Sequence, residues 1–126
     1  MAGKKLPVHI AVIMDGNGRW AQSQGKSRSF GHQEGLAAAK RITLAASKAG
    51  IKYLSLFVFS TENWKRTESE ISFLMQLLKH HLKKEYDFYR SNQIRVLHSG
   101  NLESLPGDVR KEISDVTDGT ASFTGL

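Results

Sequence analysis

The pattern of apolar and polar positions divides the chain into alternating strand and helix segments. Continuous apolar runs over residues 9–14 and 53–59 are typical of strands covered on both faces of a parallel sheet. The remaining segments are predicted from helical spacing, helix stop signals and one more short apolar run. Helices are expected over residues 17–24, 33–49, 67–91 and 106–117, and a third strand over residues 94–97.

The longest predicted helix, residues 67–91, has the clearest signals. It opens on Thr-Glu-Ser-Glu, a capping box that makes Thr67 the N-cap and brings Glu70 back toward it. An apolar stripe then recurs at helical spacing, at Ile71, Leu74, Met75, Leu78 and Leu82. Such a stripe usually packs into a core.

The order β-α-α-β-α-β-α predicts an α/β fold in which a parallel sheet is flanked by helices. With 126 residues, the chain is one domain or a portion of one. Residues 120–126 resemble the approach to a fourth strand, and the chain stops before that strand is formed. The sequence therefore indicates a domain that is truncated after roughly half of its length.

Composition excludes several classes of protein. The absence of cysteine rules out disulfides and thiolate metal sites and is compatible with a reducing cytosol. No apolar stretch approaches the roughly 20 residues that span a bilayer, and no signal-peptide core precedes the first strand. We therefore expect a soluble, cytoplasmic protein, with at most peripheral membrane contact through a lipid product.

The net charge of +6 leaves anionic partners open, including nucleic acid and small anionic substrates. The densest basic cluster lies on the helix predicted over residues 67–91, and it is more typical of a solvated helix face than of a binding site. It consists of Lys79, His80, His81, Lys83 and Lys84. No RNA-binding strand motif or basic zipper accompanies it, so nucleic acid is not expected as a partner.

The residues that follow the first strand could bind a diphosphate. Gly16 and Gly18 permit a tight turn and a close approach of backbone N–H groups to a ligand. Arg19 suits phosphate oxygens, and the Asp15 carboxylate could hold Mg²⁺. In a parallel sheet the second strand would deliver Ser60 and its neighbours to the same edge. Asp15 could instead merely cap the short helix that follows it.

Three long motifs, in order and at matching separations, resemble the signature blocks of the cis-prenyltransferases. They are H-I-A-V-I-M-D-G-N-G-R-W at residues 9–20, R-x-x-G-H-x-x-G at residues 28–35 and F-S-T-E-N-W-x-R at residues 59–66. The closest match is the undecaprenyl diphosphate synthase group, and the chain resembles its N-terminal half. The resemblance implies that a second half would carry further strands, a Y-G-G-R block, and a block with Arg and Glu near the C-terminus.

The resemblance implies a reaction and a set of residues. An allylic diphosphate, typically farnesyl diphosphate, would be extended with isopentenyl diphosphate units in the presence of Mg²⁺ to a long polyprenyl diphosphate such as undecaprenyl diphosphate. Catalytic roles are implied for Asp15 and Asn63, and a magnesium-ligand role for Asp15. Substrate-binding roles are implied for Gly16, Asn17, Gly18, Arg19, Trp20, Arg28, His32, Ser60, Glu62, Trp64 and Arg66.

Simpler interpretations stand beside several of these roles. His32 could be an ordinary surface histidine, and Glu62 could form an exposed ion pair with Arg66. Trp20 and Trp64 could be core aromatic residues, which is the interpretation we favour for Trp20. The resemblance also implies that part of the apolar stripe lines a tunnel for the prenyl tail.

Three functions compete at this point. The first is a cis-prenyltransferase that forms homodimers when full length, with this portion alone weak or inactive. The second is a non-catalytic subunit of a heteromeric prenyltransferase, although such subunits usually lack the Asp-Gly-x-Gly-Arg-Trp block that is whole here. The third is a basic nucleic-acid-binding module, suggested only by the pI of about 9.7. No Asp-Asp-x-x-Asp element is present, which argues against trans-type prenyltransferases.

Overall fold

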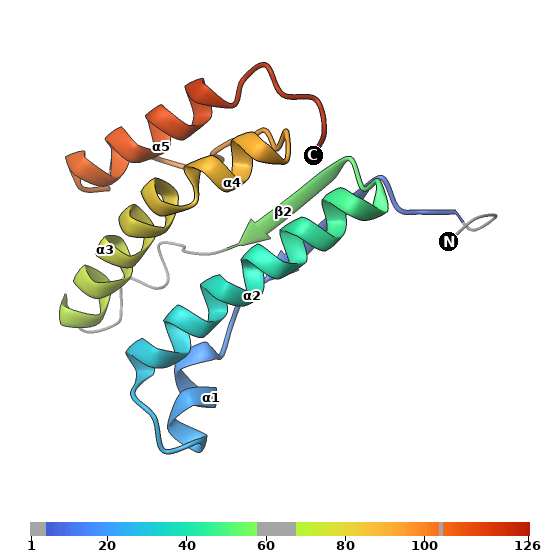
Figure 1. Cartoon of the computed structure of the whole chain (residues 1–126). Helices are drawn as coiled ribbons and strands as arrows, with labels where there is room; N and C mark the ends of the chain where they lie inside the picture. Colours follow the sequence, from blue (N-terminus) through green and yellow to red (C-terminus); the bar gives the residue numbers. More distant parts are fainter. Residues whose placement is uncertain (1–4, 58–67, 104) are drawn as a thin grey trace.

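The computed structural model describes residues 5–57, 68–103 and 105–126 (Figure 1). Two strands form a parallel sheet, and a long helix connects them. The elements in chain order are β1 (His9–Ile13), α1 (Asn17–Ser23), α2 (Arg28–Ala49), β2 (Tyr53–Phe57), α3 (Glu68–Lys84), α4 (Tyr86–Ser91) and α5 (Gly107–Gly119). The predicted α/β class with a parallel sheet is confirmed.

The two strands pair in register, with Ile13 opposite Phe57. Met14, which was predicted to belong to the first strand, lies one residue past it, although its N–H still donates to the Phe57 carbonyl at 3.2 Å. Both strands therefore end at the same edge of the sheet. Asp15 lies just past this edge, two residues after Ile13.

The sheet presents one half-buried face and one exposed face. Positions along β1 and β2 alternate between the two, and α2 packs against β2 (Figure 1). On the other face, Ile13 is 77% exposed and Phe57 is 54% exposed. The predicted burial of these strands on both faces is therefore not seen in the part of the chain that the structure describes.

Helix α2 begins at Arg28, five residues before the predicted start at residue 33. Ser27 is its N-cap, and its hydroxyl accepts the Phe30 N–H at 3.2 Å. The helix ends as predicted, with Gly50 in the left-handed conformation at φ 87°. The earlier start brings Arg28 and His32 into the first two turns of one helix, where they lie on the same face.

The predicted helix over residues 67–91 is divided in two, because the chain changes direction at Glu85 (Figure 1). The ψ angle of Glu85 is 10°, far from the helical value of about −42°. The Glu85 carboxylate bonds to Lys40 of α2 at 2.7 Å, which ties the bend to the neighbouring helix. The predicted N-cap, Thr67, lies outside the described residues.

The third strand predicted over residues 94–97 is wrong, since no strand is assigned there. Its backbone groups find other partners: Ile94 N–H donates to Tyr89 O at 2.9 Å, and Val96 N–H donates to the Thr120 hydroxyl at 2.9 Å. Arg95 N–H donates to the carbonyl of Leu126 at 2.8 Å. The C-terminal residues 120–126 therefore run beside this segment without forming a strand.

The main hydrophobic core lies between α3 and α5. Its buried members are Met75, Leu82, Val109, Ile113 and Val116, with Ile71 and Leu78 packed against them. Four of the five stripe residues therefore belong to this core, and Leu74 lies outside it.

The basic cluster of α3 is only partly a solvated face. His80, Lys83 and Lys84 are exposed as expected, whereas Lys79 forms an ion pair with Asp108 at 3.2 Å. His81 is half-buried and hydrogen-bonded to the Tyr89 hydroxyl at 3.2 Å. Burial lowers the pKa of His81, and burial also raises the pKa of Tyr89 to about 12.

Within the described ranges, no helix is both long enough and apolar enough to cross a membrane.

Candidate diphosphate site

The chain turns sharply where β1 ends. Gly16 takes the left-handed conformation at φ 81°, which favours glycine, and it is the N-cap of α1. The Asp15 carboxylate accepts the Gly16 N–H at 2.8 Å and lies 3.5 Å from the Arg19 guanidinium. The N-cap of α1 is Gly16, and the Asp15 carboxylate accepts the N–H of Gly16 itself rather than one from the first turn, so the interpretation of Asp15 as the helix cap is wrong. Both side chains of the Asp15–Arg19 pair are mostly exposed.

A second set of charged groups joins α2 to α3. Arg28 donates from Nε to Oε1 of Glu70 at 3.1 Å, and its Nη2 atom lies 3.1 Å from the same oxygen as an ion-pair contact. The Nε2 atom of His32 donates to the same oxygen at 3.0 Å. These side chains are sheltered: relative exposure is 35% for Arg28, 16% for Glu70 and 9% for His32. His32 is therefore not an ordinary surface histidine.

The two glycines of the R-x-x-G-H-x-x-G motif bring α1 directly onto α2. A Cβ atom at Gly31 would overlap the carbonyl of Asn17, and one at Gly35 would overlap the Asn17 side-chain amide. The motif therefore forms one helix face, on which two glycines receive α1 while Arg28 and His32 reach Glu70.

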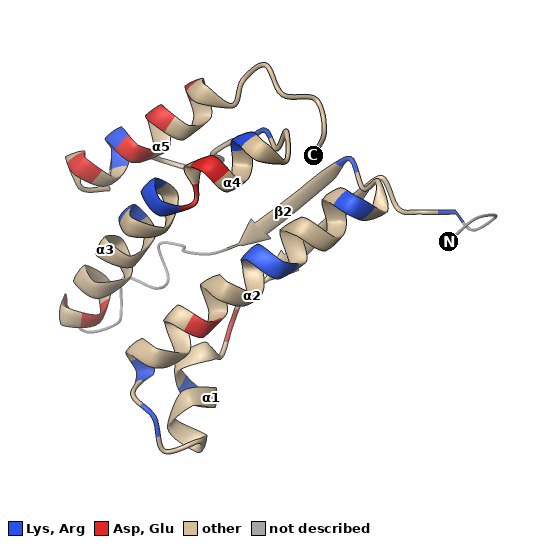
Figure 2. Cartoon of the chain, viewed as in Figure 1, with Lys and Arg blue, Asp and Glu red and all other residues tan. Residues whose placement is uncertain are grey.

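Arg28 links this second set of groups to the turn after β1. A Cβ atom at Gly18 would lie 2.7 Å from Cζ of Arg28, so the guanidinium rests against the first turn of α1. A further guanidinium nitrogen, Nη1, donates to the side chain of Gln22 at 3.4 Å. The first turns of α1, α2 and α3 thus meet around Arg28 (Figure 1), and charged residues gather where they meet (Figure 2). Arg19, in contrast, pairs with Asp15.

Trp20 corrects our sequence interpretation. It is 49% exposed and stacks on Phe30 with ring centroids 6.2 Å apart, so it is not a core residue. Gly18 and Ala21 take the buried positions of α1 instead.

The other predicted site residues lie outside the described residues. They are Ser60, Glu62, Asn63, Trp64 and Arg66. Their roles stay predictions.

Glu70 is the residue that sequence reasoning missed. The local pattern assigned it to a capping box, and its contacts with Arg28 and His32 span 42 and 38 residues. The only available signal was an acidic side chain at the start of a helix, which is common at any helix N-terminus. Gln22 was missed for the same reason, because nothing in its surroundings along the chain distinguishes it.

The described part of the chain contains no group of three or more His, Cys, Asp or Glu side chains arranged to hold a metal. Asp15 offers a single exposed carboxylate at the sheet edge. Mg²⁺ commonly binds through one or two carboxylates together with water and substrate phosphates. Asp15 therefore fits a magnesium ion that shares its ligands with a diphosphate.

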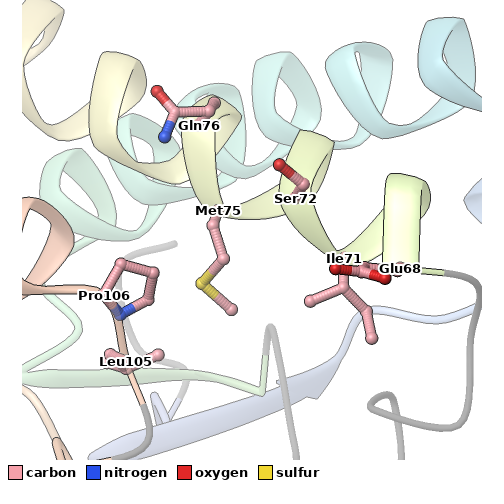
Figure 3. Close-up of a pocket in the computed structure, with 7 residues that line it drawn as sticks. All are labelled: Glu68, Ile71, Ser72, Met75, Gln76, Leu105 and Pro106. Carbon is pink, nitrogen blue, oxygen red and sulfur yellow. The ribbon is translucent and has the colours of Figure 1, made fainter.

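An apolar cavity of about 380 Å³ lies between α3 and the segment that leads into α5 (Figure 3). Its lining residues are Glu68, Ile71, Ser72, Met75, Gln76, Leu105 and Pro106. Ile71 and Met75 face this cavity, whereas Glu70 reaches toward α2, so the cavity and the charged groups lie on different sides of α3.

Known proteins resemble the chain along nearly its whole length. Residues 13–126 match the family described as putative undecaprenyl diphosphate synthase. An isoprenyl transferase of Treponema denticola is 58% identical over 117 residues, covering 93% of this chain and 52% of that protein. The (2E,6E)-farnesyl-diphosphate-specific ditrans,polycis-undecaprenyl-diphosphate synthase of Shewanella oneidensis is 43% identical, covering 98% of this chain and 45% of that protein.

Solved structures show the same similarity. Lavandulyl diphosphate synthase from Lavandula x intermedia, in complex with dimethylallyl diphosphate, superposes with a TM-score of 0.92 at 32% identity, covering 95% of this chain and 52% of that one. A probable undecaprenyl diphosphate synthase from Campylobacter jejuni gives 0.76 at 31% identity, covering 98% of this chain and 52% of that one. The chain thus spans about half the length of these relatives. The family match covers residues 13–126, and this range includes the turn after β1 and the two arginines that form ion pairs there, Arg19 with Asp15 and Arg28 with Glu70. The chain therefore belongs to the undecaprenyl diphosphate synthase family.

Proposed function

We propose that this chain carries the allylic-diphosphate-binding portion of a cis-prenyltransferase. In this reaction the C1–O bond of an allylic diphosphate such as farnesyl diphosphate breaks, and diphosphate leaves. The double bond of isopentenyl diphosphate forms a new C–C bond to C1, and loss of a proton leaves a cis alkene. The site must therefore hold a departing diphosphate and keep water from an electron-poor carbon.

Arg28 and His32 are proposed to bind oxygens of the diphosphate. The Nε atom of Arg28 already donates to Glu70 and Nη1 donates to Gln22, and the remaining N–H bonds of the five are available to a ligand. Arg19 can turn from Asp15 to a phosphate at little cost, because an exposed ion pair is worth at most about 1 kcal/mol.

Asp15 is proposed to hold Mg²⁺ beside the diphosphate. Bound there, the ion would neutralise the negative charge that accumulates on the leaving group. Once Arg19 turns to the substrate, the Asp15 carboxylate would be left to hold the metal, with Oδ1 still accepting the Gly16 N–H. Gly16, Asn17 and Gly18 would bring backbone groups close to the same oxygens.

The prenyl tail is proposed to lie along the exposed face of the sheet. Ile13 is two residues from Asp15, and Phe57 is its partner across the sheet, so apolar surface begins beside the headgroup site. The cavity between α3 and α5 is less suitable, because Ile71 and Met75 face away from the side of α3 that carries Glu70.

The remaining expectations concern a chain of the relatives' full length. The segment from Ser60 to Arg66, with Asn63 foremost, is proposed to position isopentenyl diphosphate and assist proton removal. We propose that such a full-length chain is a cytoplasmic homodimer that makes undecaprenyl diphosphate. The 126-residue chain alone is then a poor catalyst, and incorporation of labelled isopentenyl diphosphate at a rate near that of a full-length relative would contradict this.

The observation that carries the proposal is the meeting of Arg28, His32 and the Gly18 turn beside the end of β1. Isothermal titration with farnesyl diphosphate tests it, using the wild-type chain and Asp15→Ala with and without Mg²⁺. We expect the wild type to bind, and Mg²⁺ to tighten binding only when Asp15 is present. Absence of binding to the wild type under both conditions would refute the assignment.

A further inference from the structure

We infer that Glu70 is a positioning residue for diphosphate binding, holding Arg28 and His32 in the arrangement that receives the substrate. This inference rests on the proposed function and adds a residue to its site. Glu70 itself touches no substrate in this assignment. It acts through the two side chains that do.

The first argument is geometric. A single carboxylate oxygen, Oε1 of Glu70, accepts one hydrogen bond from Arg28 at 3.1 Å and one from His32 at 3.0 Å, and a second guanidinium nitrogen of Arg28 lies 3.1 Å from it in an ion pair. Both donors come from the same helix face, one turn apart, and neither side chain can change rotamer without losing its bond to this oxygen. One atom of α3 therefore sets the relative position of two groups of α2.

The second argument is the difference between the two arginine pairs. Arg19 and Asp15 are mostly exposed, so their pairing is easily exchanged. Glu70 is only 16% exposed, and a sheltered carboxylate without its donors is costly. A diphosphate is therefore expected to recruit Arg19 from its partner, while Arg28 keeps Glu70 and offers its remaining N–H bonds.

The third argument is steric. The Arg28 guanidinium lies so close to Gly18 that a single added carbon there would overlap it. The Arg28 guanidinium bonds to Glu70 on one side and contacts Gly18, in the first turn of α1, on the other. Such restraint lowers the entropy that the side chain loses when a ligand binds.

The test uses inorganic pyrophosphate and farnesyl diphosphate as probes, with four variants of the chain. Glu70→Ala removes the carboxylate, Glu70→Gln keeps an oxygen where Oε1 lies, and Glu70→Asp keeps the charge but withdraws it by one methylene. Arg28→Ala marks the site itself. Glu85→Gln is the matched control, because Glu85 also forms a sheltered ion pair, with Lys40 at 2.7 Å, but lies between α3 and α4, past the end of α3 opposite Glu70.

We expect Glu70→Ala and Glu70→Asp to weaken pyrophosphate binding about tenfold, Glu70→Gln to recover most of it, and Glu85→Gln to bind like the wild type. In nitrogen NMR of the ligand-free chain, His32 should carry its proton on Nε2 in the wild type and in Glu70→Gln. If Glu70→Ala does not fold, the other two variants still decide the question, because Glu70→Gln is expected to bind pyrophosphate more tightly than Glu70→Asp.

Several outcomes overturn the inference. If Glu70→Ala or Glu70→Gln binds pyrophosphate more tightly than the wild type, Glu70 is a competing anion. If Glu70→Asp binds pyrophosphate as tightly as the wild type, only the charge at residue 70 matters and the position of its oxygen does not, which contradicts a positioning role. If Arg28→Ala weakens binding while every Glu70 variant binds normally, the proposed function stands and the positioning role is wrong. If the wild type binds neither probe, the proposed function fails and the role of Glu70 fails with it.

Discussion

Gly31→Ala is the substitution whose outcome the structure determines most directly. Gly31 lies inside α2, where alanine would ordinarily stabilise a helix by about 1 kcal/mol. Here the added Cβ atom would overlap the backbone carbonyl and carbonyl carbon of Asn17 and approach Cβ of Ala21. The first obstacle is a backbone group, which cannot rotate away, so α1 and α2 must move apart.

The magnitude follows from these opposing effects. Overpacking a tight contact costs about 1 to 3 kcal/mol, and a backbone obstacle places this case at the upper end. Subtracting the helix-propensity gain leaves a net loss of about 2 kcal/mol in the free energy of unfolding. At about 4 °C per kcal/mol for a chain of this size, the Tm should fall by about 8 °C.

Thermal unfolding followed by circular dichroism measures this change. Gly107→Ala is the control, because Gly107 is also a helical glycine and its added Cβ would meet only Nη2 of Arg110, at 4.0 Å. The control should leave the Tm unchanged or slightly raised. A Tm for Gly31→Ala at or above that of the wild type would refute the direct packing of α1 on α2.

Further predictions concern binding, acidity and the core. Gly18→Ala should weaken pyrophosphate binding with little change in Tm, because its Cβ displaces the end of the Arg28 side chain; calorimetry checks this, and unchanged affinity would contradict the contact. Burial lowers the folded-state pKa of His81, so the stability gained by keeping His81 neutral is present above about pH 6.5 and is lost as the pH falls through the lowered folded-state pKa. We expect the wild-type Tm to decline below pH 6.5 and to decline less in His81→Gln. Burial raises the pKa of Tyr89 to about 12, so ultraviolet titration should show one tyrosine ionising near that pH. Val109→Ala, at a fully buried position, should cost about 2 kcal/mol in urea unfolding.

The sequence was sufficient to predict the elements whose signals are local. The apolar runs of β1 and β2 identified two parallel strands, and Gly50 marked the end of α2 correctly. The order of strands and helices then gave the fold class. The long-range consequence, that both strands end at one edge beside Asp15, followed from parallel pairing alone.

The errors arose where tertiary contacts override local preference. The predicted start of α2 excluded Gly31, a residue that is unfavourable in a helix by local propensity, whereas the structure includes Gly31 because the Asn17 carbonyl of α1 packs directly against it. The helix break lies at Glu85, where the carboxylate pairs with Lys40, which is 45 residues away in sequence (85 minus 40). Residues 94–97 have strand composition, yet their donors bond to Tyr89, Thr120 and Leu126 instead of to a strand.

The site shows why one motif can serve both packing and chemistry. In R-x-x-G-H-x-x-G, the spacing of three and four residues places Arg28, Gly31, His32 and Gly35 on one face of α2. The glycines set how closely α1 approaches, and that distance sets where the Arg28 guanidinium lies relative to Gly18. A substitution that widens the gap between α1 and α2 therefore changes stability and ligand geometry together. Gly31→Ala should accordingly lower both the Tm and the pyrophosphate affinity, whereas Val109→Ala, in the α3–α5 core, should lower the Tm alone.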